Sequence, residues 1–144
     1  MSAYADTSFL ASLFLIEDRS QQAREALQQE GSAITLTPLS LLELRNSFNL
    51  AVVREKISPG EVYQLWQLLE NMLGAGIFIE ATPPTAALYE KALELSDRHT
   101  PTVATRSLDL LHVAAAALLG VSAFYTFDER QRQAAVAEGL AVFP

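Results

Sequence analysis

Short apolar segments alternate with longer helical patterns along this chain, and that alternation most limits the folds open to it. The segments with the length and composition of strands are Ser2–Asp6, Ala33–Leu36, Gly76–Glu80, Ala123–Phe127 and a last short stretch within Gly139–Phe143. Strands that alternate with helices build a parallel sheet covered by helices. The sequence therefore predicts a three-layer α/β/α domain with a mainly parallel central sheet.

Two of the intervening helices carry clear start signals. Thr37 precedes a proline and is expected to cap a helix over Pro38–Val53, and Ser58 also precedes a proline and opens a helix that ends near Gly74. A hydroxyl residue followed by proline is a favoured helix start. The polar stretch His99–Thr105 is expected to be a loop. The remaining helices are expected near Ser8–Ile16, Arg19–Glu30, from Thr82 or Pro84 to Arg98, over Ser107–Leu119, and after Asp128.

Length and composition restrict the class of protein. The 144 residues, half of them hydrophobic, suffice for one domain with a substantial core, and no repeat or linker divides residues 1–144. No apolar run approaches the roughly 18 residues that suggest a membrane span, and no signal-peptide pattern stands at the start. The absence of cysteine is compatible with a reducing compartment. We expect a single-domain cytoplasmic protein without membrane contact.

Four acidic residues stand where such a sheet gathers its ligands. Asp6 and Asp128 follow two predicted strands, and open parallel sheets bind ligands at the carboxyl ends of their strands. Glu43 and Asp109 lie early in two apolar helices. Four carboxylates in one crevice repel each other unless a divalent cation neutralises them, and hard oxygen ligands suit Mg²⁺ or Mn²⁺. All four acids are therefore predicted to be both catalytic residues and metal ligands.

Each acid taken alone also has an ordinary explanation. An aspartate directly after a strand often serves only as a helix cap or turn residue, which applies to Asp6 and to Asp128. Glu43 shares a polar stripe with Asn46 and Ser47, and such a stripe can be no more than a solvated helix face. It is the occurrence of all four acids in this order and context that favours a functional site.

The acids and their neighbours resemble the PIN-domain nucleases, and in particular the small VapC-type toxins of toxin–antitoxin pairs. The resemblance covers essentially the whole chain, and its matching stretches are Ala5–Ser8, Leu42–Arg45, Ser107–Ala116 and Thr126–Gln131. It implies a PIN-like fold and a metal-dependent endoribonuclease that hydrolyses RNA phosphodiester bonds. It also implies a cognate antitoxin and a homodimer. Two alternatives remain: a PIN-domain nuclease in RNA processing or acting on DNA without a toxin role, and a catalytically silent PIN-like interaction module.

Other acid-rich α/β proteins fit poorly. A phospho-acceptor receiver domain needs a pair of adjacent acids after the first strand and a late lysine, but no lysine follows Lys91. A haloacid-dehalogenase-type phosphatase needs the motif Asp-x-Asp after the first strand. In this chain Ser8 stands in place of the second aspartate. The P-loop pattern is absent. The net charge of −7 also argues against non-specific binding along a long nucleic acid. We therefore expect the contact with RNA to be short, and the charge favours a basic protein partner.

Several neighbours of the acids have expected supporting roles. Thr7 and Thr126 carry hydroxyls that can orient a carboxylate, and Ser107 is a candidate N-cap for the helix of Asp109. His112 is expected to be a hydrogen-bonded structural residue outside the catalytic set. The arginines near the acids can hold phosphates or pair with the carboxylates: Arg45, Arg106, Arg130 and Arg132.

The only tryptophan, Trp66, lies at helical spacing with Val62, Leu65, Leu69 and Leu73. This apolar stripe predicts a core or dimer contact for the indole ring and disfavours a role in base stacking. The two helices on either side of Ser58 are where we expect a self-association surface.

Overall fold

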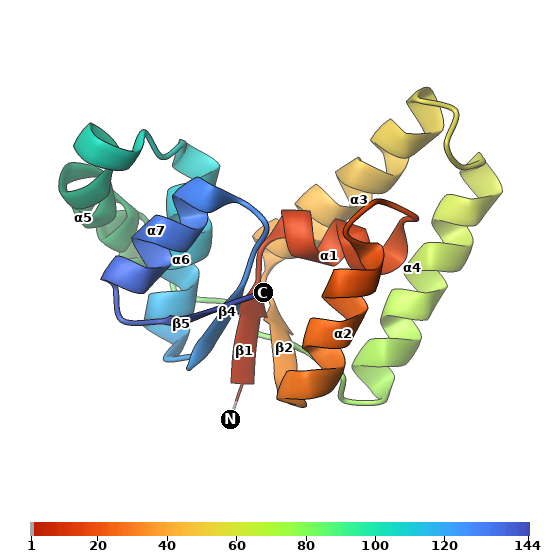
Figure 1. Ribbon diagram of the computed structural model, residues 1–144, viewed down its shortest axis with the longest axis horizontal. Helices are drawn as coiled ribbons and strands as arrows, with labels where there is room; N and C mark the ends of the chain where they lie inside the picture. The colour runs from red at the N-terminus through yellow and green to blue at the C-terminus, as the bar shows by residue number, and fades with distance from the viewer. Residues whose placement is uncertain (1) are drawn as a thin grey trace.

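A five-stranded sheet between two groups of helices makes up the computed structural model, which describes residues 2–144 (Figure 1). The strand order is β3-β2-β1-β4-β5, and every neighbouring pair is parallel. This confirms the predicted three-layer α/β/α architecture. The strands are β1 (Ser2–Ala5), β2 (Ala33–Leu36), β3 (Phe78–Glu80), β4 (Ala123–Tyr125) and β5 (Ala141–Phe143).

The helices divide by sequence between the two faces of the sheet. The N-terminal four, from red to yellow-green in Figure 1, lie on one side, and the C-terminal three lie on the other. The first group is α1 (Thr7–Phe14), α2 (Ser20–Glu30), α3 (Pro38–Val53) and α4 (Pro59–Gly74). The second group is α5 (Thr85–Val103), α6 (Ser107–Leu119) and α7 (Glu129–Ala137). The strand order places β1 at the centre of the sheet, where both layers cover it.

The pleat of β1 distributes its side chains between two hydrophobic cores. Successive side chains of a strand point to opposite faces, so Ala3 and Ala5 pack against the first helical layer while Tyr4 packs against the second. The Tyr4 ring is fully buried and stacks on Phe124 of β4 at 5.6 Å. Burial of each such large side chain stabilises the fold by about 1.5–3 kcal/mol.

Most of the predicted elements are confirmed, and three strands, β1, β3 and β4, are shorter than expected. The helix over Pro38–Val53, the strand over Ala33–Leu36 and the helix over Ser107–Leu119 have the predicted bounds. Thr37 caps α3 and Ser58 caps α4, each through a hydrogen bond from the backbone N–H three residues on. The predicted N-cap at Ser107 is wrong, because Ser107 is already the first residue of α6 and Arg106 before it is the N-cap.

The predicted loop at His99–Thr105 is also wrong over most of its length. Helix α5 continues to Val103 and contains Pro101 in its last turn. Proline removes one backbone donor, but tertiary contacts hold this turn in place: His99 is buried against Glu138 at 2.8 Å, and the hydroxyls of Thr100 and Thr105 are 2.8 Å apart.

The expected core contact of Trp66 is confirmed. Its ring packs on the core with an edge-to-face contact to Phe48 at 6.5 Å, and the Arg45 guanidinium lies 4.9 Å from its centroid.

None of the helices described for residues 2–144 is both long enough and apolar enough to cross a lipid bilayer.

Candidate active site

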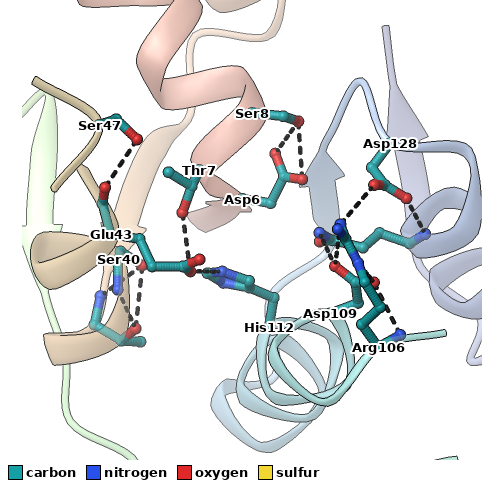
Figure 2. A network of polar contacts seen from close by, with 12 residues as sticks. Asp6, Thr7, Ser8, Ser40, Glu43, Ser47, Arg106, Asp109, His112 and Asp128 are labelled. Atoms are coloured by element: carbon teal, nitrogen blue, oxygen red, sulfur yellow. Dashed lines mark hydrogen bonds and ion pairs between the residues drawn. The ribbon is translucent and has the colours of Figure 1, made fainter. Parts of the chain in front are cut away.

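The four predicted acids come from four different elements to the carboxyl edge of the sheet (Figure 2). Asp6 and Asp128 follow the adjacent strands β1 and β4, and the Asp6 N–H extends the ladder by donating to the Tyr125 carbonyl at 3.0 Å. Glu43 comes from α3 in one helical layer, and Asp109 comes from α6 in the other. The sheet edge therefore receives acidic side chains from both of its faces.

Asp6 is the most deeply buried of the acids, with 1% of its surface exposed. It caps α1 by accepting a hydrogen bond from the Phe9 N–H at 3.0 Å. The hydroxyls of Ser8 and Thr126 also donate to its carboxylate, each at 2.7 Å. Burial raises the pKa of Asp6, although these three donors oppose the shift. The fold thus holds this carboxylate in one orientation while disfavouring its charge.

Glu43 is held by donors from both helical layers. The Thr7 hydroxyl donates to its carboxylate at 3.0 Å, and Nε2 of His112 on α6 contacts the same oxygen. Burial by itself would raise the pKa of Glu43, but the hydrogen bond and charge of His112, together with Thr7, lower it below its ordinary value. The carboxylate is therefore stabilised in its charged form.

His112 is a buried hydrogen-bonded residue, as expected, and it links Glu43 to the central strand. Its Nδ1 lies 2.7 Å from the Tyr4 hydroxyl, which also approaches the hydroxyls of Thr37 and Ser40 at 3.4 Å. An imidazole nitrogen that bears a proton donates a hydrogen bond, and one without a proton accepts it. Burial raises the pKa of Tyr4 to about 12, so this hydroxyl stays protonated and can donate.

Arg106 joins the two remaining acids. Its Nε is 3.1 Å from Oδ2 of Asp109, and its terminal nitrogen is 3.5 Å from Oδ2 of Asp128. Gln131 donates to the other Asp109 oxygen at 3.0 Å. The hydrogen bond and charge of Asp109 raise the pKa of Arg106, and the charges of Asp128 and Glu43 add to the effect. Three acids thus raise the pKa of one guanidinium, which shows that their negative charges act on the same point at this edge of the sheet.

The donor chemistry of the edge fits a hard divalent cation, since every acid offers carboxylate oxygens. The carboxylates stand in three separate sets: Asp6 among hydroxyls, Glu43 on His112, and Asp109 with Asp128 on Arg106. Within residues 2–144, no three His, Asp or Glu side chains converge closely enough to enclose a metal ion. In this arrangement Arg106 supplies the positive charge, and ligation by the four acids stays a prediction.

Sequence reasoning anticipated some of the supporting residues and missed others. Thr126 does orient an acid, but that acid is Asp6, and Thr7 holds Glu43 instead of its chain neighbour. Ser8 and Gln131 were missed, because serine and glutamine near a strand end carry no signal of their partners in the sequence. Of the arginines named as possible partners, Arg106 pairs with site acids, and Arg132 pairs with Glu129 outside the predicted set.

Comparisons with known proteins agree with this fold. The sequence model of the PIN domain matches residues 3–137. A solved structure of Mycobacterium tuberculosis VapC20, described as a sarcin-ricin loop cleaving toxin, is 20% identical over 92% of this chain and 94% of its own, with a TM-score of 0.68. That of FitAcB from Neisseria gonorrhoeae is 18% identical over 99% of this chain and 96% of its own, with a TM-score of 0.66.

The search of curated proteins gave no match. At identities of 20% and 18% the likeness to the two solved structures shows a shared fold. The match to the domain model covers nearly all of the chain and includes all four acids of the sheet edge. The chain therefore belongs to the PIN domain family.

Proposed function

We propose that residues 1–144 form a single PIN domain that acts as a metal-dependent endoribonuclease and as the toxin of a VapC-type toxin–antitoxin pair. The observation that carries the proposal is the placement of four acids, Asp6, Glu43, Asp109 and Asp128, at the carboxyl edge of the sheet of a PIN domain. Mg²⁺ or Mn²⁺ is the proposed cofactor, and the four acids would hold it in place of the Arg106 guanidinium.

A bound divalent ion would supply the charge that activates water and stabilises a leaving oxygen. The side chains around the acids hold the carboxylates in position for that ion. Ser8 and Thr126 fix the Asp6 carboxylate by hydrogen bonds, and His112 fixes Glu43 through its buried link to Tyr4. Supporting hydrogen bonds of this kind hold metal-binding carboxylates in position. Hydrolysis by water would leave a 5′-phosphate and a 3′-hydroxyl.

The choice of RNA and of a toxin role rests on similarity. VapC20 shares the fold and is described as a toxin that cleaves the sarcin-ricin loop, and that loop is RNA. The net charge of −7 supports a basic protein partner, which we propose to be the antitoxin. We also propose a cytoplasmic location.

Self-association is proposed as a homodimer through the outer face of α3 and α4. Large apolar side chains are exposed there, among them Leu42, Val53 and Tyr63. Exposed apolar groups that gather on one face favour association. Light scattering on the purified protein would measure the oligomeric state directly.

The test of function is the cleavage of total RNA by the purified protein with Mg²⁺ or Mn²⁺, followed by mapping of the cut ends. We expect cleavage at few positions, 5′-phosphate ends, and full loss of activity with a chelator. Cleavage of DNA in place of RNA would support a nuclease without a toxin role. A protein that cuts neither nucleic acid under any metal would contradict the nuclease assignment.

A further inference from the structure

The positive charges of this acidic protein are distributed unevenly. Four of the ten Lys and Arg residues form ion pairs with carboxylates, and all four lie at or beyond Lys91. Among residues 2–144 the cations without an ion pair are Arg19, Arg24, Arg45, Arg54, Lys56 and Arg130. Five of these six belong to residues 19–56, in the half of the molecule that carries α1 to α3. Cations that no carboxylate neutralises are available to an anionic ligand.

Three of these cations line a groove between α1 and α3. Two adjoining hollows of about 300 Å³ and 110 Å³ share Ala11, Glu17 and Ser47 as walls. Arg19 lies on the wider hollow, and Arg54 with Lys56 lies on the narrower one. Small side chains from the facing helices line the groove: Ser8, Ala11 and Ser12 from α1, and Ser47 and Ala51 from α3.

The wider hollow opens beside the acidic edge. Ser8 lines it and donates to Asp6, while Phe127 lines it and donates its N–H to Ser8 at 3.1 Å. Arg19 is fixed at this point because its guanidinium lies 5.1 Å from the Phe127 ring centroid and donates to the Phe127 carbonyl at 2.9 Å. A positive charge is therefore held next to the proposed reaction centre.

The groove continues away from the acids along one face of α3. Glu43, Ser47, Ala51 and Arg54 follow at spacings of three or four residues, which places them on the same side of the helix. Ser47 donates to the Glu43 carbonyl at 2.9 Å, and Figure 2 shows both residues on α3. From Glu43 to Arg54, at the rise of an α-helix, the face covers about 16 Å. The groove can thus guide a short stretch of an extended chain.

We propose that this groove is a phosphate track for single-stranded RNA, with Arg19 at the acidic edge and Arg54 and Lys56 at the far end. The inference rests on the proposed nuclease function and adds the path of the substrate. Side chains that bind phosphates are cationic and unpaired, and both conditions hold here. Glu17 also lines the groove, and its negative charge opposes the binding of phosphate there. Its carboxylate accepts a hydrogen bond from the Ser12 hydroxyl at 3.0 Å, which restrains it.

The track is tested by the binding of a short single-stranded RNA of mixed sequence to an Asp6→Asn background, which keeps the probe uncut. In that background Arg54→Gln and Lys56→Gln should each weaken binding by about fivefold and reduce the salt dependence of log K by about 0.7. Arg24→Gln removes an unpaired arginine outside the groove and should change neither quantity. Glu17→Gln should strengthen binding, whereas Glu90→Gln on the exposed face of α5 should not.

Equal RNA affinities for Arg54→Gln and Arg24→Gln would overturn the phosphate track. The same variants are assayed with an acidic peptide, and a loss of peptide binding with unchanged RNA binding would make the groove a protein-binding surface and also overturn the proposal. In the parent sequence Arg54→Gln should raise the KM for RNA cleavage more than it lowers kcat. A parent protein that cuts no RNA would count against the proposed function, while the affinity ranking of the variants would still decide the track.

Discussion

The Asp6 carboxyl group is buried away from water, with 1% of its surface exposed. Three donors hold the carboxylate, yet burial still raises its pKa. Between the ordinary and the raised pKa, the folded state binds a proton that the unfolded state has lost. Stability therefore falls as the pH rises through that window, and the penalty persists above it. Burial of Asp6 thus lowers the stability of the metal-free protein at a pH above that window.

Replacement of Asp6 by asparagine should separate function from stability. Asp6→Asn keeps the shape and removes the buried charge, so we expect the free energy of unfolding without metal to stay equal or rise by about 1 kcal/mol at neutral pH. Metal-dependent RNA cleavage should be abolished. Urea unfolding and a cleavage assay measure the two effects, with Asp97→Asn on the surface of α5 as the control. An Asp6→Asn protein that cleaves like the parent would remove Asp6 from the catalytic set.

Arg106 is the residue that a metal ion would have to displace. Its side chain is 66% exposed, so its ion pairs with Asp109 and Asp128 contribute little to stability, about 0–1 kcal/mol. In Arg106→Gln no guanidinium competes for the carboxylates, and Mg²⁺ or Mn²⁺ should raise Tm by more than it does in the parent. Arg24→Gln should respond to metal as the parent does. An identical metal response in Arg106→Gln and the parent would place the ion elsewhere.

At the scale of elements, the sequence predicted what depends on local chemistry. The caps at Thr37 and Ser58 and the bounds of α3 follow from a few adjacent residues, so they could be predicted. The last turns of α5 could not be, because they depend on Glu138, which lies 39 residues after His99 and shows no link to it in the sequence. The same limit applies to the site: the acids and Arg106, three residues before Asp109, stand in recognisable places, but Gln131, 22 residues after Asp109, becomes its partner only after folding.

Glu138 should therefore control how α5 packs on α7. Its side chain is 6% exposed and contacts Arg98, His99 and Lys91 of α5. Burial would raise its pKa, but the hydrogen bonds and charges of these partners lower it below the ordinary value. The stability that it contributes is present above the ordinary pKa and is lost as the pH falls through the lowered one.

Replacing Glu138 by glutamine should remove that dependence. We expect Glu138→Gln to lower the free energy of unfolding by about 2 kcal/mol at neutral pH and by less in acid. Denaturant unfolding across the acid range measures both effects. Glu129→Gln is the matched control, since Glu129 makes only exposed contacts, an ion pair with Arg132 and a hydrogen bond from Gln133, and its loss should cost little. A loss in Glu138→Gln that does not change with pH would mean that the contact contributes by packing and not by charge.

The whole molecule separates its charges in space. Carboxylates gather at the end of the sheet, unpaired cations line the neighbouring groove, and the sum is −7. An RNA phosphate is negatively charged, so it can bind this region only through a metal ion held by the acids or through the cations of the groove. A basic protein segment can instead bind the acids directly. The same edge can therefore serve substrate and inhibitor by opposite charge patterns.

A cognate antitoxin should accordingly inhibit by placing an arginine or lysine among the four acids, much as Arg106 pairs with Asp109 and Asp128 within the chain. Such a contact displaces metal and gives fast, salt-sensitive association. The antitoxin should compete with Mn²⁺, and its affinity should fall when all four acids are changed to Asn or Gln. The control neutralises four exposed acids away from the edge: Glu30, Glu70, Glu90 and Asp97. If calorimetry finds undiminished affinity for the four-acid variant, the antitoxin binds a remote surface and the acidic edge has no part in inhibition.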